Sequence, residues 1–145
     1  DFKPAVAVVG YGYGDYVAMR KGGKLCTPNN PIDISLFGTS FPTLEQMESA
    51  SPCRMVSENT PPMFLWCTSQ DELVPSEQTL IMGLALARQG IDYEIHIFEK
   101  GKHGYSLADQ STASHDYQIS ESVAKWTDLV KPWLYDHIPV NGCED

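Results

Sequence analysis

The chain has 145 residues, of which 42% are hydrophobic and 10% aromatic, so its composition fits one folded domain and not a disordered chain. The formal net charge of −9 argues against binding to a nucleic-acid backbone, which needs clustered Lys and Arg. No apolar run approaches the roughly 20 residues that span a bilayer, so we expect no membrane partner.

The first predicted element is a strand over residues 5–9, with the sequence Ala-Val-Ala-Val-Val. A continuous apolar run without alternation is typical of a strand that is buried on both faces of a parallel sheet. The run ends in Gly-Tyr-Gly-Tyr-Gly over residues 10–14, which permits a turn. These glycines do not predict a phosphate-binding loop, because neither Gly-Lys-Ser/Thr nor G-x-G-x-x-G is present.

Residues 15–61 show no regular pattern and are interrupted by prolines and glycines. We expect one short helix in this stretch, beginning after Pro42, with Thr43 as its N-cap and Gln46 completing a capping box. Long stretches of this kind are typical of functional or mobile loops, and a surface loop without a role is the alternative.

The stretch from Pro62 to Gly104 predicts a strand, a helix and a second strand. Apolar runs at residues 63–67 and 93–98 predict the strands, and the helix is expected over residues 76–89. Ser76 is the predicted N-cap, and Gly90 is expected to end the helix. The residues predicted to face the sheet are Leu80, Ile81, Leu84 and Ala87, while Met82 and Leu86 are assigned to the core.

Polar side chains follow both of these strands. Asp71 lies just past the first strand and His103 just past the second. In a right-handed βαβ unit the two strands are parallel, so both loops emerge at the carboxyl edge of the sheet. A carboxylate that orients an imidazole forms two-thirds of a nucleophilic triad, which makes Asp71 and His103 the candidate catalytic residues. Glu72 is the alternative acid.

The remaining histidines and the cysteines carry weaker signals. His96 falls within a predicted strand, and His115 and His137 lie in polar surroundings, so all three are interpreted as structural or solvent-exposed. Cys67 is expected to be a small buried side chain. The other cysteines, Cys26, Cys53 and Cys143, leave a disulfide open, although reduced thiols are the default expectation. The Cys and His spacing does not suggest zinc, and we expect no cofactor.

The last predicted element is a helix over residues 120–137. Trp126, Leu129, Val130, Trp133 and Leu134 recur at helical spacing and form an apolar stripe. Pro132 interrupts this stripe, so we expect a kink there or a break into two short helices. The two tryptophans are interpreted as packing anchors.

Two of these motifs together resemble a known family. Thr-Pro-Pro-Met-Phe-Leu-Trp-Cys-Thr-Ser-Gln-Asp-Glu-Leu-Val-Pro at residues 60–75, followed by Tyr-Glu-Ile-His-Ile-Phe-Glu-Lys-Gly-Lys-His-Gly-Tyr-Ser-Leu-Ala at 93–108, is similar to the C-terminal half of an α/β-hydrolase. The nearest branch is that of acetyl-xylan and feruloyl esterases and dienelactone hydrolase. The resemblance covers residue 4 to about residue 134 and is weak between residues 12 and 50. It implies an α/β fold in which residues 1–145 form one partial hydrolase domain of parallel strands with flanking helices. It also implies that residues 12–61 form a lid-like insertion.

The resemblance implies a serine esterase that acts on carboxylic esters with small acyl groups, with Asp71 and His103 as triad members. The nucleophile motif G-x-S-x-G is absent. The nearest matches, Ser40 and Ser106, lack its context, and Ser106 follows the histidine. We therefore expect the chain to be the C-terminal portion of an esterase and to be inactive alone. The alternative is a non-catalytic binding module derived from half of the fold.

The missing half of the fold also predicts a partner. The strand at residues 5–9 would lack its neighbour, so we expect it to pair in a homo-oligomer or with the absent N-terminal half. A cytoplasmic location is expected, with secretion as the alternative.

Overall fold

The computed structural model describes residues 3–22 and 30–138 of the chain. Its centre is a sheet of three parallel strands in the order β1-β2-β3, formed by Ala7–Gly10, Met63–Thr68 and Tyr93–Phe98. In this register Trp66 of β2 lies between Gly10 of β1 and His96 of β3. The strands at residues 63–67 and 93–98 are confirmed, and the first strand begins two residues later than expected.

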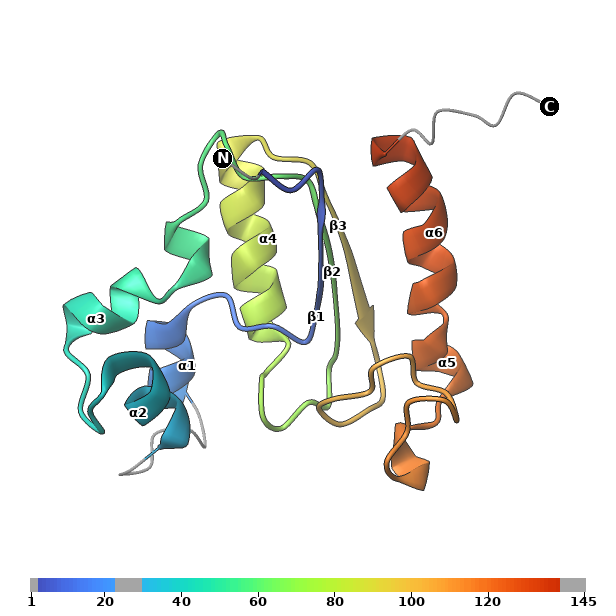
Figure 1. The fold of residues 1–145 in the computed structure, drawn as a ribbon, viewed down its shortest axis with the longest axis horizontal. Coiled ribbons are helices and arrows are strands. Elements are labelled where there is room, and N and C mark those ends of the chain that lie inside the picture. The colour runs from blue at the N-terminus through green and yellow to red at the C-terminus, as the bar shows by residue number, and fades with distance from the viewer. Residues whose placement is uncertain (1–2, 23–29, 139–145) are drawn as a thin grey trace.

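Helices cover both faces of the sheet (Figure 1). Helix α4 (Glu77–Gln89) lies on one face, and α5 (Glu121–Ala124) and α6 (Trp126–His137) lie on the other. The shorter elements α1 (Tyr16–Gly22), α2 (Pro31–Phe37) and α3 (Leu44–Ser49) form a group on the α4 side. Two single 3₁₀ turns, η1 (Pro52–Arg54) and η2 (Asp116–Gln118), complete the described elements.

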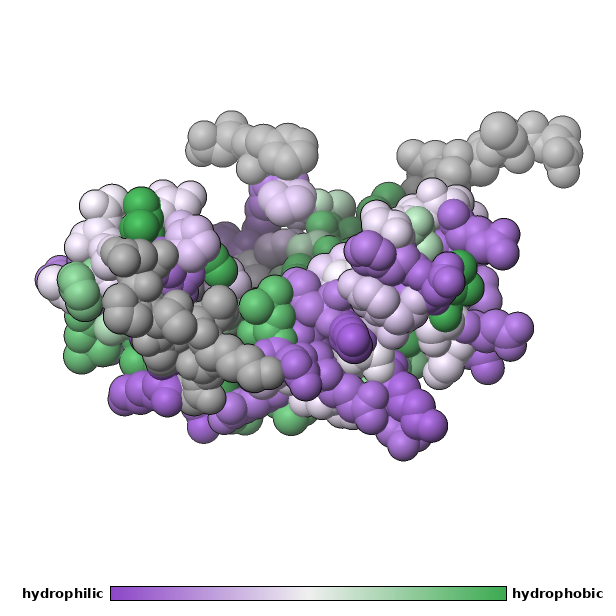
Figure 2. All heavy atoms as spheres, turned by 90° about the horizontal axis from the view of Figure 1, so that it is seen from below, coloured by the Kyte–Doolittle hydropathy of each residue, from purple (hydrophilic) through white to green (hydrophobic). Residues whose placement is uncertain are grey.

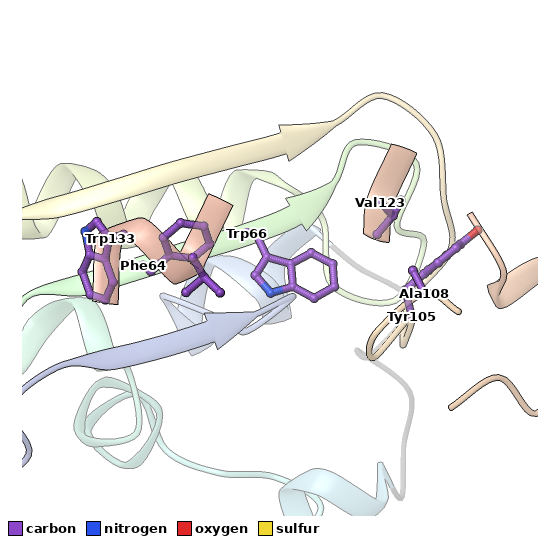
Figure 3. Close-up of a cluster of buried hydrophobic side chains, with 7 residues drawn as sticks. Phe64, Trp66, Tyr105, Ala108, Val123 and Trp133 are labelled. Carbon is purple, nitrogen blue, oxygen red and sulfur yellow. The ribbon is translucent and has the colours of Figure 1, made fainter. Parts of the chain in front are cut away.

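The central strand β2 is buried along its whole length because its side chains alternate between two cores. Phe64 and Trp66 point to the α6 face, where they meet Trp133 and the loop after β3 (Figure 3). Met63 and Leu65 point to the α4 face. This explains the unbroken apolar run of β2, and it confirms the two tryptophans Trp126 and Trp133 as packing residues.

The prediction of which face of α4 meets the sheet was wrong. Leu80 and Leu84 are about half exposed, at 53% and 51%. The buried face instead contains Gln78, Thr79, Met82, Gly83 and Leu86, so the assignment of Met82 and Leu86 to the core is confirmed. Gly83 explains the choice, because a Cβ there would lie 2.3 Å from Ile95 Cδ1. The helix packs through its smallest residue and so approaches the sheet closely.

The ends of the helices differ in detail from the expectation. Ser76 makes no capping hydrogen bond through its side chain, while Gly90 ends α4 in the left-handed conformation as predicted. The C-terminal stretch does divide into two helices, but the break is at Lys125, and α6 continues through Pro132. The missing N–H of Pro132 therefore does not end the helix.

The segment between β1 and β2 contains more helix than its sequence indicates. The capping box of α3 is confirmed, with Gln46 N–H donating to Thr43 Oγ1 and Thr43 N–H to Gln46 Oε1. Helices α1 and α2 were not predicted. They are joined by the buried carboxylate of Asp33, which accepts a hydrogen bond from the Tyr16 hydroxyl and forms an ion pair with Arg20. Burial and this hydrogen bond raise the pKa of Tyr16.

The start of this segment, at residues 14–16, is hydrogen-bonded to α4 and to Ser51. The side-chain oxygen of the buried Gln78 accepts hydrogen bonds from the backbone N–H groups of Gly14 and Asp15. Ser51 Oγ accepts another from Tyr16 N–H. Residues 14–16 therefore have a fixed position relative to the sheet.

The structure also bears on the cysteines, on membrane-spanning helices and on metal sites. Cys67 is buried as expected, at 1% exposure, and Cys26 and Cys143 lie outside the described residues. Across residues 3–22 and 30–138 no helix is long and apolar enough to cross a membrane. The same residues contain no group of three or more His, Cys, Asp or Glu side chains placed to hold a metal ion.

Candidate active site

The loops that follow β2 and β3 meet at the carboxyl edge of the sheet, and each contributes one of the predicted residues. The ring N–H at Nδ1 of His103 donates a hydrogen bond to Asp71 Oδ2 at 2.7 Å. The Asp71 side chain is 0% exposed and that of His103 is 30% exposed. The carboxylate is therefore shielded from water, while part of the imidazole remains open to solvent and to a substrate.

The carboxylate of Asp71 is held by its own loop. Its other oxygen, Oδ1, accepts hydrogen bonds from the backbone N–H groups of Leu73 and Val74, both at 2.8 Å. The bond from Leu73 N–H, two residues after the aspartate, makes this an Asx-turn, which aspartate side chains favour. The D-x-x-V-P sequence thus fixes one oxygen and leaves the other for His103. Of the two adjacent acids, the geometry favours Asp71 over Glu72.

The loop that carries His103 is positioned by its glycines and by two side chains. Gly101 has φ 140° and Gly104 has φ 82°, values that favour glycine. The hydroxyl of Thr68, at the end of β2, donates to the carbonyl of Gly101 at 2.8 Å. The side-chain amide of Gln118 donates to the carbonyl of Gly104 at 2.6 Å. The histidine is therefore bracketed by two hydrogen-bonded glycines.

Aromatic side chains from β2, from α6 and from the loop after β1 pack against the His103 loop. The rings of Trp66 and Trp126 stack with centroids 5.0 Å apart, and the indole N–H of Trp126 donates to the carbonyl of Ser106 at 2.9 Å. Tyr11, just past β1, lies edge-to-face against both Trp66 and His103. Sequence reasoning treated the tryptophans only as packing anchors and did not single out Tyr11. The available signal was a large aromatic residue between two glycines at the end of a buried strand.

The other candidates have structural partners. His96 is hydrogen-bonded to Glu94 within β3, at 2.6 Å. His115 precedes η2 and stacks on Tyr117, and the ring of His137 packs at a tilt against that of Trp133 near the end of α6. The nucleophile motif requires a serine at a sharp turn from a strand into a helix. Ser40 lies between α2 and α3, and Ser106 lies in the loop between β3 and η2, so neither has this setting.

Figure 2 views the molecule from the carboxyl edge of the sheet. Hydrophilic residues predominate over the centre and right of this face, and the larger hydrophobic patches lie to the left, on the side of α1–α3. A recess opens at the top of the view, on the β1 side of the sheet.

Comparison with known proteins assigns the family. The sequence model of the prolyl oligopeptidase family matches residues 2–133 of this chain. The chain belongs to the prolyl oligopeptidase family. It is therefore a member of a family of serine hydrolases and esterases with the α/β-hydrolase fold.

Several solved structures of hydrolases share the fold. An acetyl ester-xyloside bifunctional hydrolase from Caldicellulosiruptor lactoaceticus is 31% identical, with a TM-score of 0.71, over 92% of this chain and 42% of that one. A carboxylesterase from Lactobacillus plantarum is 25% identical with a TM-score of 0.75, over 94% and 46% of the two chains. A sugar hydrolase from Lactococcus lactis is 27% identical with a TM-score of 0.73, over 93% and 49%.

One curated relative matches over a shorter stretch. Endo-1,4-beta-xylanase B from Butyrivibrio fibrisolvens is 35% identical over 68 residues, which is 47% of this chain and 11% of that protein. The chain thus spans less than half the length of these structural relatives and a small part of the xylanase. The predicted fold class, a partial α/β-hydrolase with a parallel sheet and flanking helices, is confirmed.

Proposed function

We propose that this chain is the C-terminal portion of a serine esterase and supplies the acid and the base of its catalytic triad. The observation that carries the proposal is the hydrogen bond between His103 Nδ1 and the buried carboxylate of Asp71. Carboxylic esters with small acyl groups are the proposed substrates. The similarity to a carboxylesterase and to an acetyl ester-xyloside hydrolase supports this substrate class.

The geometry suits general base catalysis. Because Asp71 accepts a hydrogen bond from the N–H at Nδ1 of His103, the proton is on that nitrogen, and the other ring nitrogen, Nε2, is left with a lone pair. In the proposed reaction Nε2 takes the proton of a serine hydroxyl as the serine oxygen attacks the ester carbonyl carbon. The imidazolium, stabilised by Asp71, then gives that proton to the departing alcohol oxygen, leaving an acyl-enzyme. Water attacks the acyl-enzyme by the same route and releases the acid.

The serine and the oxyanion hole are proposed to lie in a polypeptide segment that precedes Asp1 in the full coding sequence. Strand β1 is an edge strand here, paired only with β2 among the described strands. We propose that the strand preceding the serine pairs with this open edge. Residues 12–61 are proposed to cover part of the site, since α1–α3 lie on the α4 side toward the carboxyl ends of the strands (Figure 1).

A binding module without catalytic activity is the second candidate. It is favoured by one observation, which is that the sequence contains no G-x-S-x-G. The two candidates differ in what precedes Asp1. The enzyme requires an upstream G-x-S-x-G in the same coding sequence, and the module requires none.

The proposal is tested by hydrolysis of p-nitrophenyl acetate by the protein expressed from its full coding sequence. We expect Asp71→Asn to lower kcat by about 10⁴-fold, as loss of the correct histidine tautomer does in a serine protease triad. Asp109→Asn is the matched control, because Asp109 is an exposed loop residue. A dipeptide p-nitroanilide tests the peptidase alternative within the family.

Equal kcat values for Asp71→Asn and the control would refute the triad role. Faster hydrolysis of the p-nitroanilide than of the ester would keep the triad and overturn the proposed substrate class. A coding sequence with no upstream serine motif, together with an inactive wild-type protein, would favour the binding module.

A further inference from the structure

We propose that Tyr11 is a positioning residue that fixes the plane of the His103 imidazole. The proposal rests on the proposed function, because it concerns the orientation of the base in that reaction. It assigns a role to the first loop at the carboxyl edge of the sheet, which lies outside the two catalytic motifs at residues 71–75 and 101–104.

The contact is made by the rings themselves. The centroids of the Tyr11 and His103 rings are 4.9 Å apart with an interplanar angle of 72°, which is the edge-to-face arrangement that aromatic pairs prefer. The hydrogen bond to Asp71 constrains only the Nδ1 atom of the imidazole. An imidazole that is held through a single nitrogen can still tilt, and tilting bends the Nδ1–H···Oδ2 hydrogen bond and exposes its proton to water. A ring packed edge-to-face against it limits the tilting and so directs Nε2.

Tyr11 is itself held in place by Trp66. Its ring lies edge-to-face on Trp66 at 5.1 Å and 88°, and its backbone N–H donates to the carbonyl of Trp66 at 2.7 Å. The Trp66 ring cannot move toward β1, because it packs directly on Gly10. A Cβ added at Gly10 would lie 2.8 Å from the Trp66 ring. On its other side Trp66 stacks on Trp126. The support for His103 therefore extends through packed aromatic rings to a buried strand and to α6.

The backbone of Tyr11 is strained. Its φ of 43° lies in the left-handed region, which an aromatic residue adopts at a cost. Among the described residues the other non-glycine residues with positive φ are Ser106 and Ala108, both in the loop that follows His103. Strain of this kind concentrates at functional sites, where surrounding contacts maintain it. Glycines flank Tyr11 on both sides, yet the strained position itself carries a large ring.

The test is NMR spectroscopy of the protein expressed from its full coding sequence, following the Nδ1 proton of His103, assigned by its absence in His103→Gln. The measured quantity is the rate at which this proton exchanges with water. The variant is Tyr11→Asn, because asparagine tolerates the left-handed conformation and removes the ring. Tyr11→Phe keeps the ring, and Tyr13→Asn is the matched control in the same loop. Tyr13 packs on Tyr16 at 5.6 Å.

We expect exchange in Tyr11→Asn to be faster on the order of 2- to 10-fold, from the strength of one aromatic pair, with Tyr11→Phe and Tyr13→Asn unchanged. If Tyr11→Asn does not fold, Tyr11→Met, which keeps apolar volume without an aromatic ring, makes the same comparison. Equal exchange rates in the wild-type protein and the ring-free variant would overturn the role of Tyr11 alone. A wild-type protein without a hydrogen-bonded Nδ1 proton would overturn the Asp71–His103 pair as well, and with it the proposed function.

Discussion

The attachment of the first loop to α4 through Gln78 leads to a quantitative prediction. Gln78 is 1% exposed, and its Oε1 accepts hydrogen bonds from Gly14 N at 3.1 Å and Asp15 N at 2.9 Å. The backbone at Gly14 has no room to move closer, because a Cβ there would lie 2.4 Å from the Gln78 carbonyl oxygen. Gln78→Met retains the length and the helix propensity of the side chain but removes the acceptor.

The expected loss follows from the burial of the two donors. The bond to Gly14 N is fully buried and that to Asp15 N is partly buried, so water replaces the acceptor only at Asp15. An unsatisfied buried donor costs about 1–3 kcal/mol, and we expect the free energy of unfolding to fall by about 2–3 kcal/mol in total. This is a large fraction of the roughly 5–15 kcal/mol that is typical of a domain.

Urea denaturation followed by circular dichroism measures this change. Gln89→Met is the matched control, since Gln89 lies on the same helix and is exposed. Hydrogen exchange of the Gly14 and Asp15 amides provides a local measurement, and both amides should lose protection in Gln78→Met. If the two variants unfold at the same urea concentration and the amides stay protected, the loop is not held by Gln78 and the reasoning is refuted.

Two further predictions concern the central strand. Thr68→Val removes the hydroxyl that holds Gly101 and should lower the free energy of unfolding by about 1–3 kcal/mol, seen as a lower urea midpoint; an unchanged midpoint would contradict the role of this bond. Burial raises the pKa of the Cys67 thiol, so less thiolate is present at pH 8 than in a free cysteine, and iodoacetamide should label Cys67 only in urea. Mass spectrometry of the Cys67 peptide measures the extent of labelling. Rapid labelling of the folded protein would show that β2 is not buried around Cys67.

The proximity of Asp71 and His103 in the candidate site was predictable because its signals are local. An apolar run followed by D-x-x-V-P and another followed by G-x-H-G place an acid and a histidine after parallel strands, and parallel strands end at one edge. The contact between Asp71 and His103 follows from that topology. The role of Tyr11 was not predictable in this way, because its contacts are with Trp66 on β2 and His103 after β3.

The orientation of α4 depends on tertiary packing. The helix carries two apolar stripes at helical spacing, one with Leu80 and Leu84 and the other with Met82 and Leu86, and the pattern alone does not rank them. The close approach of Gly83 to Ile95 selects the second stripe. Helices α1 and α2 were missed for a similar reason, since the buried Asp33 network that joins them is invisible in the periodicity of either segment.

The central claim, that His103 with Asp71 activates a serine, is tested most directly by labelling with a fluorophosphonate. The protein expressed from its full coding sequence is compared with His103→Ala and with the control His115→Ala, whose histidine stacks on Tyr117. We predict that His103→Ala lowers the rate of serine labelling about 10²- to 10⁴-fold, the contribution of a positioned general base, while His115→Ala is labelled at the wild-type rate. Equal labelling rates for His103→Ala and the wild-type protein would contradict the claim.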